Sequence, residues 1–292
     1  MTPADPLSRA LDEAVAGRHK VLFDLLARGS HLPGTRINAD LVDAFAQACR
    51  SRGSRADAVA LAMARMTADE APGATAREFL PVCGVHALAA RATADAAVRG
   101  RFVAELHARA DDLRFRVRDA VIEGLARVGG AAGDALVIDV ASWMDGYFHA
   151  AAVVRALAHE AWLPAIHDVG AVVSRLDEAF ALARDAPRAA ARWPGHKALM
   201  EALGDAPGAV AVRFGVPVFD LFVRWAAEEH PPLREALATT LRYRKLAGRF
   251  GPELARVQAA IKASTPARRN PDHDPGPTRD RSKNRRRGRR SL

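Results

Sequence analysis

Asp111-Asp-Leu-Arg-Phe-Arg-Val-Arg-Asp-Ala-Val-Ile-Glu-Gly-Leu-Ala-Arg-Val-Gly129 is the stretch that decides the fold, because it has the pattern of one amphipathic helix. Four of its apolar residues recur at steps of four, four and three and therefore share one helix face: Val117, Val121, Leu125 and Val128. We expect Asp112 to cap the start of this helix and Gly129-Gly130 to end it. Such a helix cannot bury its apolar face alone, so the stretch predicts partner helices before and after it.

Weaker copies of the stretch occur on both sides of it. Arg55-Ala-Asp-Ala-Val59 is an earlier copy, residues 152–157 repeat its apolar pattern at a shift of 32, and Arg234-Glu-Ala-Leu237 repeats Arg118-Asp-Ala-Val121 at a shift of 116. A period in the low thirties is typical of helix–turn–helix repeats. The sequence therefore predicts an all-α fold, a right-handed α-solenoid of about five to six irregular helix pairs.

Several helix boundaries follow from the apolar spacing and from capping residues. We expect a first helix from Pro6 to Ala27, a helix capped by Asn38 or Asp40, and one from Tyr147 to Trp162. A long amphipathic helix is expected over residues 168–184. After Trp162 the period becomes irregular, which leaves the number of repeats open.

The positive charge is concentrated at the C-terminus. Of the net charge of +9, ten Lys or Arg and three Asp place +7 in residues 263–292, which leaves +2 for residues 1–262. The last thirty residues contain almost no apolar side chains, so they are expected to be disordered. The chain is therefore divided into a helical repeat domain, 1–262, and a disordered basic tail, 263–292.

Composition favours a helical protein of the cytoplasm. Apolar residues make up 49% of the chain but aromatic residues only 6%, which suits helices packed through small side chains better than a β-sandwich. The two cysteines, Cys49 and Cys83, are far apart and are expected to be buried free thiols. No secretory leader or membrane-spanning stretch is recognised, so we expect no membrane association.

The segment from Asp112 to Val121, with its aromatic-Arg-Val-Arg step followed by Asp-Ala-Val, resembles a HEAT repeat of the bacterial type. Phe79-Leu-Pro-Val-Cys-Gly-Val-His-Ala-Leu88 and Pro232-Leu-Arg-Glu-Ala-Leu237 extend the resemblance, which covers roughly residues 77–250 and points to an uncharacterised group of bacterial HEAT-repeat proteins. More distantly, the chain resembles the HEAT-like DNA alkylation repair enzymes and the PBS-lyase HEAT-like proteins. HEAT arrays serve as scaffolds, adaptors and occasionally enzymes, so the resemblance implies a fold more than an activity.

The resemblance to DNA alkylation repair enzymes implies one alternative function, that of a DNA glycosylase. Such enzymes hold DNA in a basic concave groove with tryptophans and an acidic residue near the lesion, and Trp143 and Asp145 are the candidates for these roles here. The chain does not match the glycosylase motif residue by residue. A nearly neutral body is also unexpected for a groove that must neutralise phosphates.

Two sets of arginines are the candidate binding residues. Arg116 and Arg118 either form ion pairs within and between repeats or belong to a basic strip on the concave face. In the tail, seven basic residues form a flexible arm that would bind nucleic acid or another polyanion without reading its sequence: Arg281, Lys283, Arg285, Arg286, Arg287, Arg289 and Arg290.

Other chemistry is weakly indicated. Cys83 and His86 lie three residues apart but have no second pair with ligand spacing, so core packing is the expected role. No nucleotide-binding glycine motif or nucleophile elbow occurs, and no cofactor or metal is expected. The sequence therefore predicts a non-enzymatic scaffold or adaptor that binds a protein partner on its concave face and uses its tail for DNA, RNA or another polyanion.

Overall fold

The computed structural model describes residues 5–265, and in this range the chain forms helices and connecting turns without a β-strand. The predicted all-α class is therefore confirmed for this part of the chain. The α-helices are α1 (Pro6–Val15), α2 (Lys20–Arg28), α3 (Ala39–Arg52), α4 (Ser54–Ala64), α5 (Phe79–Ala94), α6 (Ala96–His107), α7 (Phe115–Ala132), α8 (Asp134–Asp139), α9 (Tyr147–Leu157), α10 (Val169–Arg184), α11 (Pro194–Asp205), α12 (Pro207–Phe214), α13 (Val216–Ala226), α14 (Pro231–Thr240) and α15 (Gly251–Ser264). Short 3-10 helices join them at η1 (Ala76–Glu78), η2 (Val140–Asp145), η3 (Leu163–Ala165) and η4 (Arg188–Arg192).

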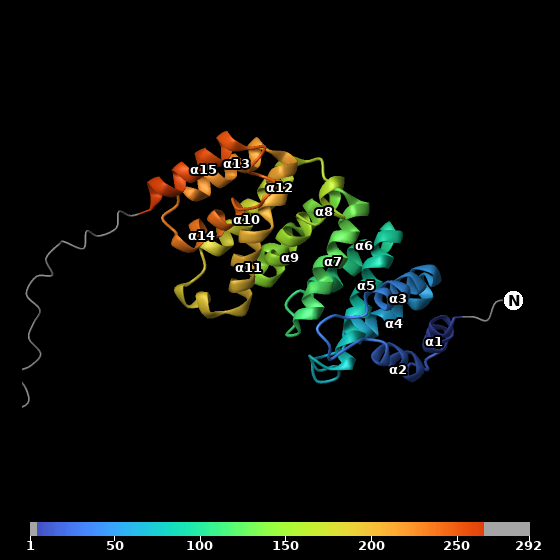
Figure 1. Ribbon diagram of the computed structural model, residues 1–292. Helices are drawn as coiled ribbons and strands as arrows, with labels where there is room; N and C mark the ends of the chain where they lie inside the picture. Colours follow the sequence, from blue (N-terminus) through green and yellow to red (C-terminus); the bar gives the residue numbers. More distant parts are fainter. Residues whose placement is uncertain (1–4, 266–292) are drawn as a thin grey trace, which may run out of the picture.

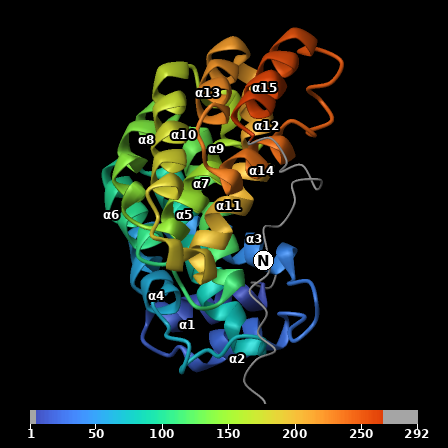
Figure 2. The ribbon, with the colours of Figure 1, turned by 90° about the vertical axis from the view of Figure 1, so that its left-hand side faces the viewer.

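Five of the helices form a row through the molecule. Helix α5 packs against α7, α7 against α9, α9 against α11 and α11 against α14. Helices α6, α8 and α10 lie along one side of this row, as Figure 2 shows most clearly, and α13 continues them toward the C-terminal end. At the N-terminal end α3 and α4 pack on α5, and at the other end α15 packs on α13 (Figure 1).

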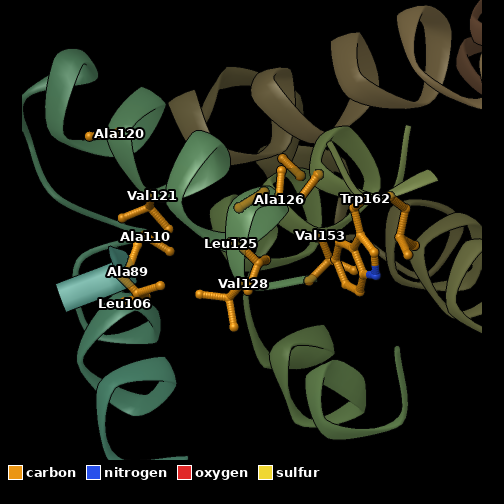
Figure 3. Close-up of a cluster of buried hydrophobic side chains, with 14 of the residues drawn as sticks. Ala89, Leu106, Ala110, Ala120, Val121, Leu125, Ala126, Val128, Val153 and Trp162 are labelled. Carbon is orange, nitrogen blue, oxygen red and sulfur yellow. The ribbon is translucent and has the colours of Figure 1, made fainter. Parts of the chain in front are cut away.

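Small residues allow the neighbouring helices to approach closely. A Cβ at Gly84 of α5 would overlap the backbone of Ala64 in α4, and a Cβ at Gly129 of α7 would overlap the indole ring of Trp162. Figure 3 shows this core, with Trp162 beside Val153 and near Leu125, and with Ala89 and Leu106 facing Val121. Because interiors pack as densely as organic crystals, these close approaches leave no room for larger side chains.

The central helix is displaced from its predicted limits. Helix α7 begins at Phe115, its cap residue is Arg114, and no side chain caps it. The prediction that Asp112 caps the helix is therefore wrong. Gly129 and Gly130 lie inside the helix, which ends only at Gly133, where φ is +59°. The reason is packing, because the Trp162 ring lies where a side chain at residue 129 would be, so glycine is needed there. The positive φ that ends the helix is supplied instead by Gly133.

Asp112 instead forms an ion pair with Arg114, and this pair fixes the turn before α7. The Arg114 guanidinium donates to both Asp112 carboxylate oxygens, at 2.8 and 2.6 Å, and to the backbone carbonyls of Met66, Thr67 and Ala71 at 2.7–3.2 Å. All five of its N–H groups are used. Burial raises the pKa of Asp112, but the hydrogen bonds and charge of Arg114 outweigh it and hold that pKa below its usual range.

Two other predicted helices are shorter than expected. The first is divided into α1 and α2, because Gly17 has a φ of +90° and turns the chain. The predicted helix from Tyr147 to Trp162 ends at Leu157 as α9, because residues 159–165 turn to bring Trp162 against α7. Other boundaries are confirmed: Asn38 caps α3 through a hydrogen bond from the Leu41 amide, and Asp168 caps α10.

The predicted correspondence between residues 118–121 and 234–237 has a structural counterpart. Arg118 donates to the carbonyl of Asp112, six residues before it, and Arg234 donates to the carbonyl of Glu228, also six residues before it. Both arginines therefore close the turn that precedes their own helix. Arg234 also binds the Ser264 carbonyl at 3.0 Å and so connects α14 with α15.

Cys49, Cys83 and His86 all lie in the core. Both cysteines are fully buried free thiols, as predicted, and His86 is 2% exposed. Burial lowers the pKa of His86 to about 4, with a smaller contribution from the charge of Arg127. His86 is therefore a neutral core residue at pH 7. Between residues 5 and 265, every helix is too short or too polar to cross a lipid bilayer.

The close approaches at Gly84 and Gly129 predict the effect of adding one methyl group. We expect Gly84→Ala and Gly129→Ala each to lower the free energy of unfolding by about 1–3 kcal/mol, because a backbone or an indole ring must move. Gly100→Ala in α6 is the matched control: no atom lies within 4 Å of its Cβ position, so that substitution should stabilise the protein by about 0.5–1 kcal/mol. Urea unfolding of the three variants measures these changes, and equal effects at all three positions would contradict the packing described here.

The low pKa of His86 predicts a loss of stability in acid. The unfolded histidine titrates near its ordinary pKa of about 6.5 and the folded one near about 4, so the unfolded chain binds more protons between these values. The contribution of His86 to the free energy of unfolding should therefore be fully present above pH 6.5 and should fall by up to about 3 kcal/mol as the pH drops to about 4. In urea unfolding at a series of pH values, His86→Leu should remove this part of the pH dependence, whereas the exposed His167→Leu should retain it.

Candidate functional site

Exposed apolar side chains gather on one edge of the molecule. Leu113 is 86% exposed, Phe115 52% and Trp193 46%; Leu113 and Trp193 lie in the turns before α7 and α11, and Phe115 is the first residue of α7. Figure 1 shows the loops before α5, α7 and α11 on this same edge. Single exposed apolar residues are normal on a protein surface, but a continuous group of them marks a contact surface.

Contacts between aromatic rings and arginines connect the starts of α7, α9 and α11 into one strip. The Arg116 guanidinium lies 4.6 Å from the centre of the Phe115 ring, and that of Arg118 lies 4.5 Å from the centre of the Phe148 ring. The Tyr147 and Trp193 rings are 6.1 Å apart, and Gly195 of α11 lies against Phe148. We call the strip the aromatic–arginine edge, and it consists of Leu113, Phe115, Arg116, Arg118, Tyr147, Phe148 and Trp193.

The two predicted binding arginines are close together but are engaged within the protein. Arg116 forms an ion pair of 3.0 Å with Glu78, whose side chain is 1% exposed, and donates to the Gly34 carbonyl at 3.1 Å. Arg118 donates to the Asp112 carbonyl. The ion pair with Glu78 and the hydrogen bond to Gly34 therefore account for the Arg116 guanidinium within the protein. What both arginines offer to a partner is the flat guanidinium face stacked beside an aromatic ring.

A groove of about 280 Å³ opens beside the edge, between α5, α7 and the loop at residues 35–37. Val82 and His86 contribute from α5, and Asp119 and Glu123 from α7. Burial raises the pKa of Asp119, and the charges of Arg155, Arg118 and Arg116 only partly oppose it. Acidic and basic groups alternate here with apolar ones. The groove therefore lacks the continuous positive charge that a DNA backbone requires.

A larger hollow of about 800 Å³ lies toward the C-terminal end of the row. Its walls include three basic side chains, Arg213, Lys245 and Arg249, and one carboxylate, Glu160. Arg213 is directed to the Ile166 carbonyl at 3.4 Å, and Arg249 stacks 5.1 Å over the Phe250 ring. This hollow therefore has a local positive excess.

The alternative catalytic pair is placed differently from what a glycosylase would need. Trp143 is 2% exposed, so its indole face is not available for stacking on a base. Its ring meets the imidazoles of His107 and His149 edge-on, at centre-to-centre distances of 5.1 and 6.3 Å. Asp145 is half exposed and contacts the same two histidines. Trp143 and Asp145 therefore belong to one cluster with the two histidines, in which Trp143 is buried and Asp145 is exposed.

The sequence did not indicate this histidine cluster. The spacing of Asp145 and His149, four residues apart at a helix start, is a local signal that sequence reasoning passed over. His107 lies 38 residues before Asp145, at the end of α6, so its contact with Asp145 depends on how helices distant in the sequence pack together. Burial raises the pKa of Asp145, but the hydrogen bond from His107 and the nearby imidazoles lower it overall.

The seven basic tail residues predicted to bind polyanions, Arg281 to Arg290, lie outside the residues that the structure describes. A scan against protein-family models gives no match for this chain, and searches of curated proteins and of solved structures give none either.

Proposed function

We propose that this chain is a non-enzymatic scaffold of HEAT-like helix pairs that binds a protein partner along the aromatic–arginine edge and the adjoining groove. The observation that carries the proposal is the exposure of Leu113, Phe115 and Trp193 along one edge, together with Arg116 and Arg118, each of which lies beside an aromatic ring. Trp, Tyr and Arg are the residues most often found at the energetic centres of protein interfaces. The mixed charge of the groove also suits a protein better than a nucleic acid.

A right-handed α-solenoid is part of this proposal. The helices of the row begin at residues 79, 115, 147, 194 and 231, so successive starts lie 36, 32, 47 and 37 residues apart. Three of these intervals are close to the period of known helical repeats. The long interval contains α10, a helix of 16 residues, followed by η4. In such an array the row would line the concave face, and the aromatic–arginine edge, where we place the partner, would border that face.

The tail has a separate role in the proposal. The body, residues 1–262, carries a net charge of only +2, whereas residues 263–292 carry +7. A basic arm next to a nearly neutral body gains affinity for DNA, RNA or another polyanion by counterion release, without reading a sequence. We propose that the tail localises the scaffold on a polyanion and that the edge selects the protein partner.

Introduction of a negative charge on the aromatic–arginine edge tests the protein-binding role. We expect Phe115→Glu and Trp193→Glu each to weaken partner binding by about 2 kcal/mol or more, roughly thirtyfold, because each places a carboxylate in an apolar contact. Ile138→Glu on α8, at a residue that is 63% exposed, is the matched control and should bind like the unmodified chain. The measurement is quantitative mass spectrometry of proteins recovered with each tagged chain from its native cells, after thermal melting has shown that all of them fold. Equal recovery by all four chains would contradict the proposal.

Removal of the tail tests the polyanion role. A chain that ends at residue 265 should lose salt-sensitive binding to duplex DNA and to RNA, because the ten basic residues of the tail are gone. Its helical circular dichroism and melting temperature should match those of the full chain. If the shortened chain still bound DNA with a steep salt dependence, the binding would belong to the body, and the hollow around Arg213 and Lys245 would be the first place to examine.

A further inference from the structure

The cluster of His107, Asp145 and His149 joins two successive helix pairs. His107 is the last residue of α6, Asp145 the last of η2, and His149 lies in the first turn of α9. One nitrogen of each imidazole faces the same carboxylate: His107 Nε2 is 3.1 Å from Asp145 Oδ1 and Oδ2, and His149 Nδ1 is 2.8 Å from Oδ1. One donor atom from each of the three residues lies within 4.8 Å of the other two.

We propose that these three residues form a binding site for a divalent transition metal, with Zn²⁺ as the ion. Two imidazole nitrogens and one carboxylate oxygen are a donor set that suits Zn²⁺, which takes such ligands at about 2.0–2.2 Å. Donor atoms around a tetrahedral Zn²⁺ lie roughly 3.3 Å apart. The distances of 2.8 and 3.1 Å between the donors are already close to this value.

The surroundings of the cluster favour ligation by these particular nitrogen atoms. The buried Trp143 ring packs against both imidazoles in edge-to-face geometry, and one nitrogen of each imidazole contacts Asp145. Gly146 is needed beside them, because a Cβ at this position would lie 2.6 Å from His149 Nδ1. A larger residue between Asp145 and α9 would therefore cover one of the proposed ligand atoms.

Binding requires one small rearrangement. The two imidazole rings are stacked, with their centres 4.0 Å apart and their planes inclined by 24°. An imidazole lone pair lies in the plane of its ring, so the two ring planes must converge on the side of the nitrogens and the far sides of the rings must move apart. The side chains of His107 and Asp145 are 29% and 52% exposed and that of His149 is 14% exposed, so His107 and Asp145 have the most room to move.

Three protein ligands leave the fourth position of a tetrahedral ion open. Structural zinc sites are closed by four protein ligands, whereas sites that react or bind exogenous groups retain water or another ligand in the fourth position. The exposed side of Asp145 is where this position would lie. The site therefore takes a water molecule, or an anionic or imidazole group from a bound molecule. It would also tie α6 to α9 across two helix pairs.

Calorimetric titration of Zn²⁺ into the full chain, after treatment with a chelator, tests the proposal. We expect one ion per chain with a dissociation constant in the micromolar range or below, a higher melting temperature with Zn²⁺ than without, and visible absorption bands when Co²⁺ replaces it. Asp145→Asn retains the shape of the side chain and should weaken binding at least tenfold, as should His107→Ala and His149→Ala. Melting of each metal-free variant shows whether it folds, and Asp145→Asn decides the outcome if a histidine variant does not.

Two histidines outside the cluster serve as controls. His167 is exposed on the folded body, and His273 lies between two aspartates outside the described residues, so His167→Ala and His273→Ala should bind Zn²⁺ like the unmodified chain. The proposal is overturned if Asp145→Asn binds as tightly as the unmodified chain, or if His273→Ala removes binding. It is equally overturned if no saturable binding occurs below millimolar Zn²⁺.

Discussion

The close approach of neighbouring helices in the row is the constraint on which the rest of the structure depends. At three contacts of the row, a glycine faces the neighbouring helix: Gly124 of α7 faces Ala89, Gly195 of α11 faces Phe148, and Gly204 of α11 faces Thr239. Alanine and leucine are the most frequent residues in the buried core of the described residues. Because the helices of the row are held so close, the turns that precede them are brought to one edge of the molecule, where the exposed side chains gather (Figure 1).

Burial of one residue explains the exposure of its neighbours in the turn before α7. Arg114 is buried and uses every N–H group of its guanidinium within the protein, on Asp112 and on three carbonyls of the 66–71 segment. With Arg114 fixed inward, Leu113 and Phe115 on either side of it are directed to solvent. The exposure of these two residues is thus built into the turn. A buried charge pair of this kind is costly unless it is fully hydrogen-bonded, which Arg114 is.

The sequence predicts the helices well and the site only in part. Apolar spacing identifies α7, α10 and the equivalence of Arg118 with Arg234, because these depend on local periodicity. The sequence does not reveal the role of Gly129, because a glycine that ends a helix and one that receives an indole ring look the same in sequence. The arginine pattern identifies Arg116 and Arg118 as candidates, but Phe148 and Trp193, which complete the aromatic–arginine edge, lie much later in the chain. The contact of His107 with Asp145 could not be predicted, since it depends on the stacking of one pair on the next.

Hydrogen exchange measured by mass spectrometry, with and without a purified protein partner, tests the central claim most directly. If the partner docks on the aromatic–arginine edge, the amides around residues 111–118, 147–149 and 192–196 should exchange more slowly in the complex. Amides of α8 around Ile138, a residue that is also exposed, should exchange at the same rate in both samples. Protection of α8 with no change at the edge would contradict the account, because the partner would then bind the opposite layer of helices.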